Sequence, residues 1–142
     1  MKRYAALVLL IGAIIIQPGL SSGADYSGQW VGTITESENR CDNLGKAKLG
    51  KYTLTITHKG NDLVVMENLV KRPYSGVFNP SNPQIAHILG SYVDDGGFVT
   101  ELVDLEFESD STGNGKSVWR WSNGYYSCGG KFSFTMLKQK SE

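Results

Sequence analysis

The chain has 142 residues, 40% of them hydrophobic, and its 14 basic residues balance 14 acidic ones, so the formal net charge at pH 7 is zero. This length suits one globular domain with its own core and is too short for two ordinary domains. The lack of a basic excess argues against nucleic acid as a partner, because proteins bind the phosphate backbone through clustered Lys and Arg.

A secretory signal peptide is predicted at the N-terminus. Lys2 and Arg3 precede an apolar run of 12 residues, Ala5–Ile16, and small residues follow at positions 22–24. This order is typical of a cleavable leader, and the run is shorter than the roughly 20 residues that cross a membrane as a helix. We expect cleavage after Ala24, a mature domain over residues 25–142 without a permanent membrane anchor, and export to the periplasm or the extracellular space. Without the leader the domain has 12 basic and 14 acidic residues, so nucleic acid stays excluded.

Alternation of apolar and polar residues recurs in short segments separated by Gly, Asn, Asp and Pro, whereas long helical periodicity is missing. In Lys51–His58, for example, Tyr52, Leu54 and Ile56 share one face and threonines share the other. Eight strands are predicted, over residues 29–36, 51–58, 63–67, 74–78, 85–92, 98–108, 116–122 and 131–138. In the sixth segment the alternation breaks at Glu101 and Leu102, where a β-bulge is expected to re-aim both side chains.

The cysteines and the histidines are interpreted as structural residues. Cys41 and Cys128 both follow the leader, and paired thiols in an oxidising compartment are expected to form a disulfide. No further cysteine or histidine stands at a ligand spacing from them, so no metal is expected. His58 and His87 each lie within a predicted strand and are interpreted as structural. The carboxylates at 104, 106 and 108 alternate with core residues, so they are predicted to form a solvated outer wall.

The chain contains none of the motifs that usually mark a catalytic or phosphate-binding site. We therefore expect no catalytic residue and no cofactor, and binding is favoured over catalysis. Trp119 and Trp121 share one face of their strand, and burial of both rings is the first interpretation. The alternative is an exposed aromatic strip with Tyr125 and Tyr126, which would stack on sugars or a partner protein and place Arg120 inside.

The segment Tyr26–Ile34 carries a Gly-x-Trp motif, Gly28-Gln29-Trp30, at the start of the first of the eight strands. It resembles the opening of the calycins, the superfamily of lipocalin, avidin and fatty-acid-binding barrels. In that superfamily the tryptophan plugs the closed end of the barrel, under a basic residue from the last strands. The resemblance implies that Trp30 is this plug and that Lys138 or Arg120 covers it, a contact that would gain roughly 0.5–2 kcal/mol.

Periodicity alone allows either two packed sheets or a barrel. The resemblance implies the second: an all-β, eight-stranded antiparallel up-and-down barrel, lipocalin-like and held by one disulfide. Cys41 lies just past the first strand and Cys128 just before the last, and these strands must meet for the barrel to close. The disulfide is therefore expected to join the seam, and its reduction to loosen the closure near Trp30.

The function implied by the resemblance is binding of a small apolar or amphipathic ligand in the open end of the barrel. A fully packed interior would contradict this hypothesis. The alternative is a protein-binding module, such as a secreted protease inhibitor. The candidate ligand-binding residues are Tyr52, Ile56, Leu89, Phe107, Phe134, Trp119 and Trp121.

Overall fold

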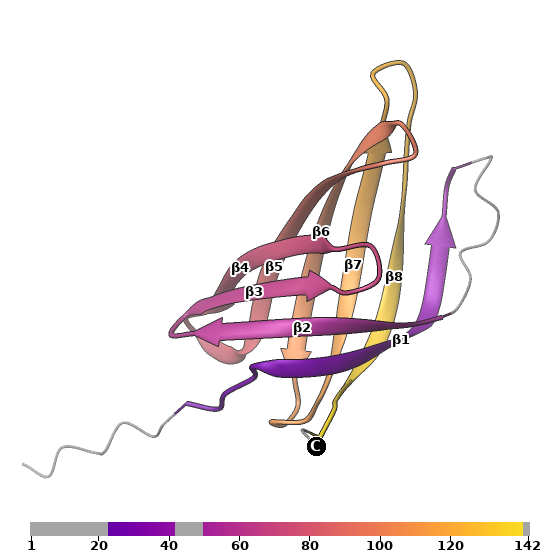
Figure 1. The fold of residues 1–142 in the computed structure, drawn as a ribbon. Helices are drawn as coiled ribbons and strands as arrows, with labels where there is room; N and C mark the ends of the chain where they lie inside the picture. Colours follow the sequence, from indigo (N-terminus) through magenta and orange to yellow (C-terminus); the bar gives the residue numbers. More distant parts are fainter. Residues whose placement is uncertain (1–22, 42–49, 141–142) are drawn as a thin grey trace, which may run out of the picture.

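Eight antiparallel strands pair in sequence order and close into a barrel in the computed structural model, which describes residues 23–41 and 50–140 (Figure 1). The strands are β1 (Gly28–Asn39), β2 (Lys51–Lys59), β3 (Asp62–Glu67), β4 (Arg72–Asn79), β5 (Asn82–Asp94), β6 (Gly97–Phe107), β7 (Thr112–Ser122) and β8 (Ser127–Lys138). The predicted up-and-down barrel is confirmed, and the described residues contain no helix. Most of the predicted signal peptide, residues 1–22, and residues 42–49 lie outside the described residues.

The barrel closes where β1 pairs with both β2 and β8. Trp30 lies opposite Leu54 of β2 on one side and Lys138 of β8 on the other. Beyond Thr33 the pairing continues with β8 alone, after a register shift between Ile34 and Glu36, and β1 turns from the direction of β2 to that of β8 (Figure 1). This bend lets one strand pair with both edges of the sheet and so close the barrel.

The predicted disulfide is confirmed: Cys41 is bonded to Cys128, with 5.1 Å between their Cα atoms. It joins the segment after β1 to the start of β8, next to the pair Asn39 and Gly130, and so lies on the seam. Trp30, in contrast, pairs with Lys138 at the far end of β8. The disulfide and Trp30 are therefore at opposite ends of the barrel, so this placement does not support the expectation that reduction loosens the region of Trp30.

The β6 strand alternates strictly between the inside and the outside of the barrel. Its register with β5 and with β7 runs without a shift, so the bulge predicted at Glu101 and Leu102 is wrong. Glu101 points inward and is 4% exposed, whereas Leu102 points outward and is 63% exposed. Three hydroxyl groups inside the barrel donate hydrogen bonds to the Glu101 carboxylate and so stabilise its inward position.

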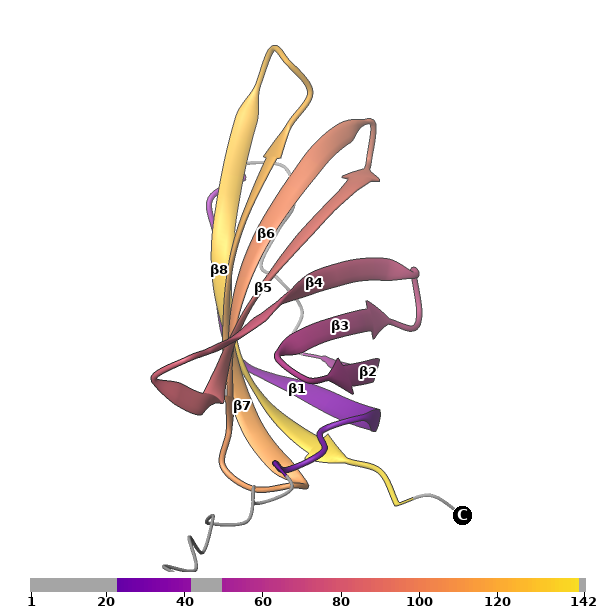
Figure 2. The ribbon, with the colours of Figure 1, turned by 90° about the vertical axis from the view of Figure 1, so that its left-hand side faces the viewer.

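Both strands of the β7–β8 hairpin are longer than predicted, because glycines that look like turn residues lie inside them. Gly115 pairs with Phe134, and Gly130 pairs with Trp119. A Cβ atom at either glycine would overlap the ring of its partner. These glycines therefore make room for aromatic rings. Figure 2 shows from the side that the β5–β6 and β7–β8 hairpins reach beyond the shorter β3–β4 hairpin.

One end of the barrel, here called the closed end, is plugged by aromatic side chains. Trp30 is 0% exposed, its Nε1 donates to the carbonyl of Tyr26 at 2.9 Å, and the Tyr26 ring stacks on Phe107 with 3.9 Å between centroids. Lys138 Nζ lies 5.9 Å from the centroid of the Trp30 ring, where the resemblance placed a basic residue. Arg120 is exposed on the outer face and pairs with residues near the other end, so its suggested contact with Trp30 is wrong.

Candidate ligand-binding cavity

A cavity of about 710 Å³ occupies the half of the barrel that contains the disulfide, here called the open end. This volume falls within the range of roughly 300–1,000 Å³ that is usual for small-molecule pockets. The described residues that line it come from all eight strands and four connections, and most are apolar or aromatic. They are Ile34, Cys41, Tyr52, Leu54, Val65, Glu67, Leu69, Val70, Arg72, Tyr74, Ile88, Tyr92, Asp94, Asp95, Val99, Glu101, Val103, Leu105, Trp119, Trp121, Tyr126, Cys128, Phe132 and Phe134.

Four of the sequence-predicted ligand-binding residues line this cavity: Tyr52, Trp119, Trp121 and Phe134. The two tryptophans are half-buried, and Trp121 Nε1 donates to the carbonyl of Asp94 at 2.8 Å. They face the inside of the barrel, so the alternative of an exposed aromatic strip on the outer wall is wrong.

The other three candidates lie elsewhere. Ile56 and Phe107 are buried in the core toward the closed end and do not line the cavity. Leu89 is 50% exposed and points outward, because Ile88 and Gly90 take the inward positions of β5. Its assignment to the interior is therefore wrong. Both faces of this strand carry apolar residues, so the alternation in the sequence did not show which face is inside.

Five of the aromatic rings that line the cavity lie over glycines of neighbouring strands. A Cβ atom at Gly90 would overlap the ring of Tyr74, and one at Gly32 would overlap the ring of Tyr52. The same holds for three other pairs on neighbouring strands, and all five rings line the cavity. Because each ring occupies the space of a missing side chain, it leaves the centre of the barrel open. The three other pairs are Gly97 with Trp121, Gly115 with Phe134 and Gly130 with Trp119.

The carboxylate of Glu101 is held by three hydroxyl groups. Tyr74 Oη and Tyr92 Oη each donate to Oε2 at 2.8 Å, and Ser117 Oγ donates to Oε1 at 2.5 Å. Tyr74 reaches Glu101 from β4 across β5, and it can do so because Gly90, which pairs with both residues, has no side chain. Glu101 was missed as a site residue, although its charge on the apolar face of β6 was the signal that could have identified it.

Burial is the main cause that raises the pKa of the Tyr52, Tyr74 and Tyr92 phenols well above their ordinary value of 10.0. The negative charge of Glu101 is the second cause in each case and raises the pKa further. All three phenols therefore stay protonated at neutral pH, and those of Tyr74 and Tyr92 act as hydrogen-bond donors toward the carboxylate.

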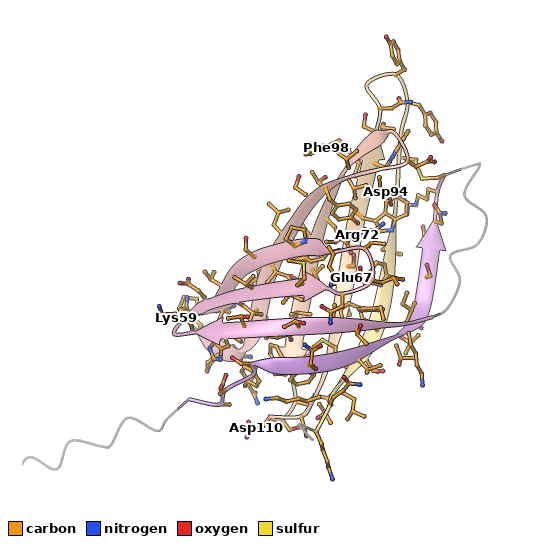
Figure 3. All side chains as sticks on the ribbon, in the orientation of Figure 1. Lys59, Glu67, Arg72, Asp94, Phe98 and Asp110 are labelled. Atoms are coloured by element: carbon orange, nitrogen blue, oxygen red, sulfur yellow. A yellow bond between two sulfur atoms is a disulfide. The ribbon has the colours of Figure 1, made fainter. Side chains whose placement is uncertain are left out.

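At the open end, charged side chains surround the connection between β3 and β4. The two carboxylate oxygens of Glu67 accept from the N–H groups of Leu69 and Val70, each at 2.9 Å. Arg72 Nη2 lies 2.6 Å from Asp94 Oδ2, and its guanidinium lies 4.5 Å from the centroid of the Tyr92 ring. Figure 3 labels Glu67, Arg72 and Asp94 near one another, with Lys59 and Asp110 away from them.

Some hydrogen-bond donors of the described lining have no partner in the protein. Within the described part of the chain, neither the Tyr52 hydroxyl nor the Trp119 indole N–H donates a hydrogen bond to the protein.

Among residues 23–41 and 50–140 no group of three or more His, Cys, Asp or Glu could hold a metal ion. In those ranges the structure has no helix with the length and apolar character of a membrane span.

The remaining site predictions concern histidines and outer carboxylates. His58 stacks on Tyr26 at the closed end, and its Nε2 lies 2.8 Å from the carbonyl of Gly60. His87 lies on the outer face, where its Nδ1 is 2.7 Å from Asp104 Oδ1. The carboxylates at 104, 106 and 108 are all exposed, as the sequence predicted for an outer wall.

No family model matches this chain, and no curated protein matches it. The chain is similar to the solved structure of EF1p2_mFAP2b bound to DFHBI, with a TM-score of 0.50 and 14% sequence identity. The match covers 80% of this chain and 94% of the other. At this identity the likeness shows the β-barrel fold alone.

Proposed function

We propose that this chain is an exported, calycin-like barrel that binds a small apolar or amphipathic molecule in its open end. The observation that carries the proposal is the cavity of about 710 Å³, with its mostly apolar and aromatic lining. A barrel of eight strands can be filled completely by its own side chains, so a cavity of this size is not a necessary consequence of the fold.

The way the cavity is built supports the same proposal. Five aromatic rings lie over glycines of neighbouring strands, so the bulkiest side chains of the open end line its walls. A ligand that enters would exchange water for contact with these rings and with aliphatic side chains, and that burial is the main source of affinity for an apolar molecule. A barrel of this fold is bound to DFHBI in EF1p2_mFAP2b, whereas the argument for this chain comes from its own cavity.

The disulfide supports export. Disulfides persist in oxidising compartments, and the bond between Cys41 and Cys128 joins two strands that must stay paired for the barrel to remain closed. Together with the leader sequence, it favours a function in the periplasm or outside the cell. Detection of the mature chain, beginning after Ala24, in the periplasmic or secreted fraction would test this part of the proposal.

Titration with the neutral fluorescent probe N-phenylnaphthylamine tests the binding function. We expect saturable binding with one site per chain, and displacement by any molecule that co-purifies with the native protein. A wild-type protein that binds neither this probe nor smaller naphthyl compounds contradicts the proposal, whatever the variants do.

A matched pair of variants on β6 locates the site. Val103 is buried and lines the cavity, whereas its neighbour Leu102 points outward. Val103→Trp should weaken probe binding by about tenfold, which corresponds to about 1.4 kcal/mol. Leu102→Trp should leave binding unchanged. Near-ultraviolet circular dichroism checks that both variants are folded, and equal affinities in the two folded variants would place the probe outside the cavity.

A further inference from the structure

Glu101 is a buried carboxylate without a cationic partner. It is 4% exposed, and among the described residues no Lys, Arg or His forms an ion pair with it. Its three hydrogen bonds come from neutral hydroxyl groups. A buried charge normally has an opposite charge beside it, because removing an ion from water is costly. The carboxylate therefore lacks the partner that would best compensate its burial.

The described lining of the cavity has an excess of negative charge. It includes the carboxylates of Glu67, Asp94, Asp95 and Glu101, and Arg72 is its one cationic side chain. The guanidinium of Arg72 is already paired with Asp94. Charges interact more strongly in a partly desolvated cavity than in water. Such a lining attracts a cation and repels the carboxylate of a fatty acid.

Aromatic rings surround the position of Glu101. Trp119 pairs directly with it on β7, and both side chains line the cavity. Tyr52 lines the same cavity, and the charge of Glu101 acts on its phenol. Aromatic faces attract cations, and a carboxylate among aromatic rings is a combination that suits an ammonium group. The unused donors of Tyr52 and Trp119 could also bind an acceptor elsewhere on the ligand.

From these observations we infer that the ligand is a cationic amphiphile, with a protonated amine that pairs with the Glu101 carboxylate and an apolar body that lies against the aromatic lining. This inference rests on the proposed function, since it names the chemical class of the molecule that the cavity takes. The hydroxyl groups of Tyr74, Tyr92 and Ser117 orient the carboxylate, and the amine fills its remaining hydrogen-bonding capacity.

Three probes with one naphthyl body and different head groups test the inference by isothermal titration calorimetry. They are naphthylethylamine, which is cationic at neutral pH, naphthylethanol, which is neutral, and naphthylacetate, which is anionic. The amine should bind about tenfold or more tightly than the alcohol, as expected for a desolvated charge pair. The acetate should bind most weakly, because its charge meets the carboxylates of the lining.

Two charge-neutralising variants on β6 assign the preference to one residue. Glu101→Gln keeps the shape and a hydrogen-bond acceptor but removes the charge. The affinity for the amine should therefore fall to the affinity for the alcohol. The affinity for the alcohol in this variant is the reference, because it reports any change in the cavity that does not depend on the charge of the ligand. Glu106→Gln makes the same charge change on the exposed outer face of the strand and should change neither affinity.

The outcomes separate this inference from the proposed function. If neither N-phenylnaphthylamine nor any naphthyl probe binds, the proposed function fails and the inference falls with it. If the alcohol or the acetate binds the wild type as tightly as the amine, the inference is overturned while the binding function stands. A preference for the amine that survives in folded Glu101→Gln overturns the pairing with Glu101. Should that variant not fold, the order of the three probes on the wild type decides.

Discussion

The two ends of the barrel are both rich in aromatic residues, yet one is solid and the other is hollow. At the closed end the rings of Tyr26, Phe78 and Phe107 pack against one another, and Phe107 also packs edge-on against Trp30. At the open end the rings of Tyr74 and four others lie over glycines of neighbouring strands. The free space inside a barrel therefore depends on what each ring faces across the sheet, and not on the number of rings.

The ends also differ in how they treat polar groups. Trp30 Nε1 at the closed end is satisfied by a backbone carbonyl within the same segment, whereas Glu101 at the open end collects donors from three other strands. A polar network that spans strands β4 to β7 constrains their relative positions. Hydrogen bonds to the Glu101 carboxylate therefore join the strands of the open end, whereas contacts between aromatic rings join those of the closed end.

Removal of the disulfide should have the largest effect, and it should act on the open end. The bond closes a loop with a sequence separation of 87 residues. The chain-entropy model assigns such a loop about 4.5 kcal/mol of the free energy of unfolding. The double variant Cys41→Ala, Cys128→Ala should lose this amount in urea denaturation.

Tryptophan emission of the same variant sharpens the comparison of the ends. Trp119 and Trp121 line the cavity with the two cysteines, so their emission should shift, whereas that of Trp30 should not. A background of Trp119→Phe and Trp121→Phe isolates the signal of Trp30. A shift in that background would contradict the separation of the two ends.

Truncation of a ring at each end should cost different amounts. Trp30 is fully buried, so Trp30→Ala should destabilise the protein by about 3–5 kcal/mol, the usual range for a buried aromatic residue. Trp119 is half-buried beside an existing cavity, so Trp119→Ala should cost about 1–2 kcal/mol and weaken probe binding instead. Chemical denaturation and probe titration measure both effects. Equal losses of stability would refute the distinction between a packed and a hollow end.

Gly90→Ala tests the role of glycine in the open end. The added Cβ would overlap the ring of Tyr74 and displace it from Glu101, so we expect a loss of about 1–3 kcal/mol, as for other overpacked sites. Probe affinity should fall as well, because the displaced ring enters the cavity. Ser91→Ala changes the next, outward residue and should stay within about 0.5 kcal/mol of the wild type. An unchanged probe affinity in Gly90→Ala would show that the displaced Tyr74 ring does not enter the cavity.

Alkaline titration should give the smallest effect and should distinguish the two ends by cause. Burial, followed by the charge of Glu101, raises the pKa of Tyr74 and Tyr92, whereas burial followed by the charge of Asp110 raises the pKa of Tyr26. These phenols favour the folded state fully below pH 10, and this contribution is lost as the pH rises above that value.

Absorbance of tyrosinate measures this titration directly. The charge of Glu67 also raises the pKa of Tyr52, and the positive charge of Arg72 over the Tyr92 ring lowers the pKa of Tyr92. In Glu101→Gln, therefore, Tyr74 and Tyr92 should ionise at a lower pH than in the wild type while Tyr26 is unaffected. The same titration curve for both proteins would show that Glu101 does not act on these phenols.

Much of the fold could be predicted from the sequence. Alternation located all eight strands, because a half-buried strand needs a period of two in its side chains. Two cysteines flanking the first and last strands predicted the disulfide and its place on the seam. Predictions were weakest where glycine occurs: residues 110–115 and 122–130 looked like loops, but β7 begins at Thr112 and β8 at Ser127, and Gly115 and Gly130 make room for rings across the sheet.

Local patterns in the sequence were enough to predict eight strands and a disulfide beside the first and the last of them. The closed barrel was predicted from the resemblance, since alternation alone also allows two packed sheets. The inner face of β5 became known from the structure, in which Leu89 is outside and Ile88 lines the cavity. The tertiary structure also decided that Glu101 stays inside without a bulge and that the open end is hollow. The reason is that each of these features depends on contacts between neighbouring strands, such as the ring of Tyr74 over Gly90, which no single segment of the sequence contains.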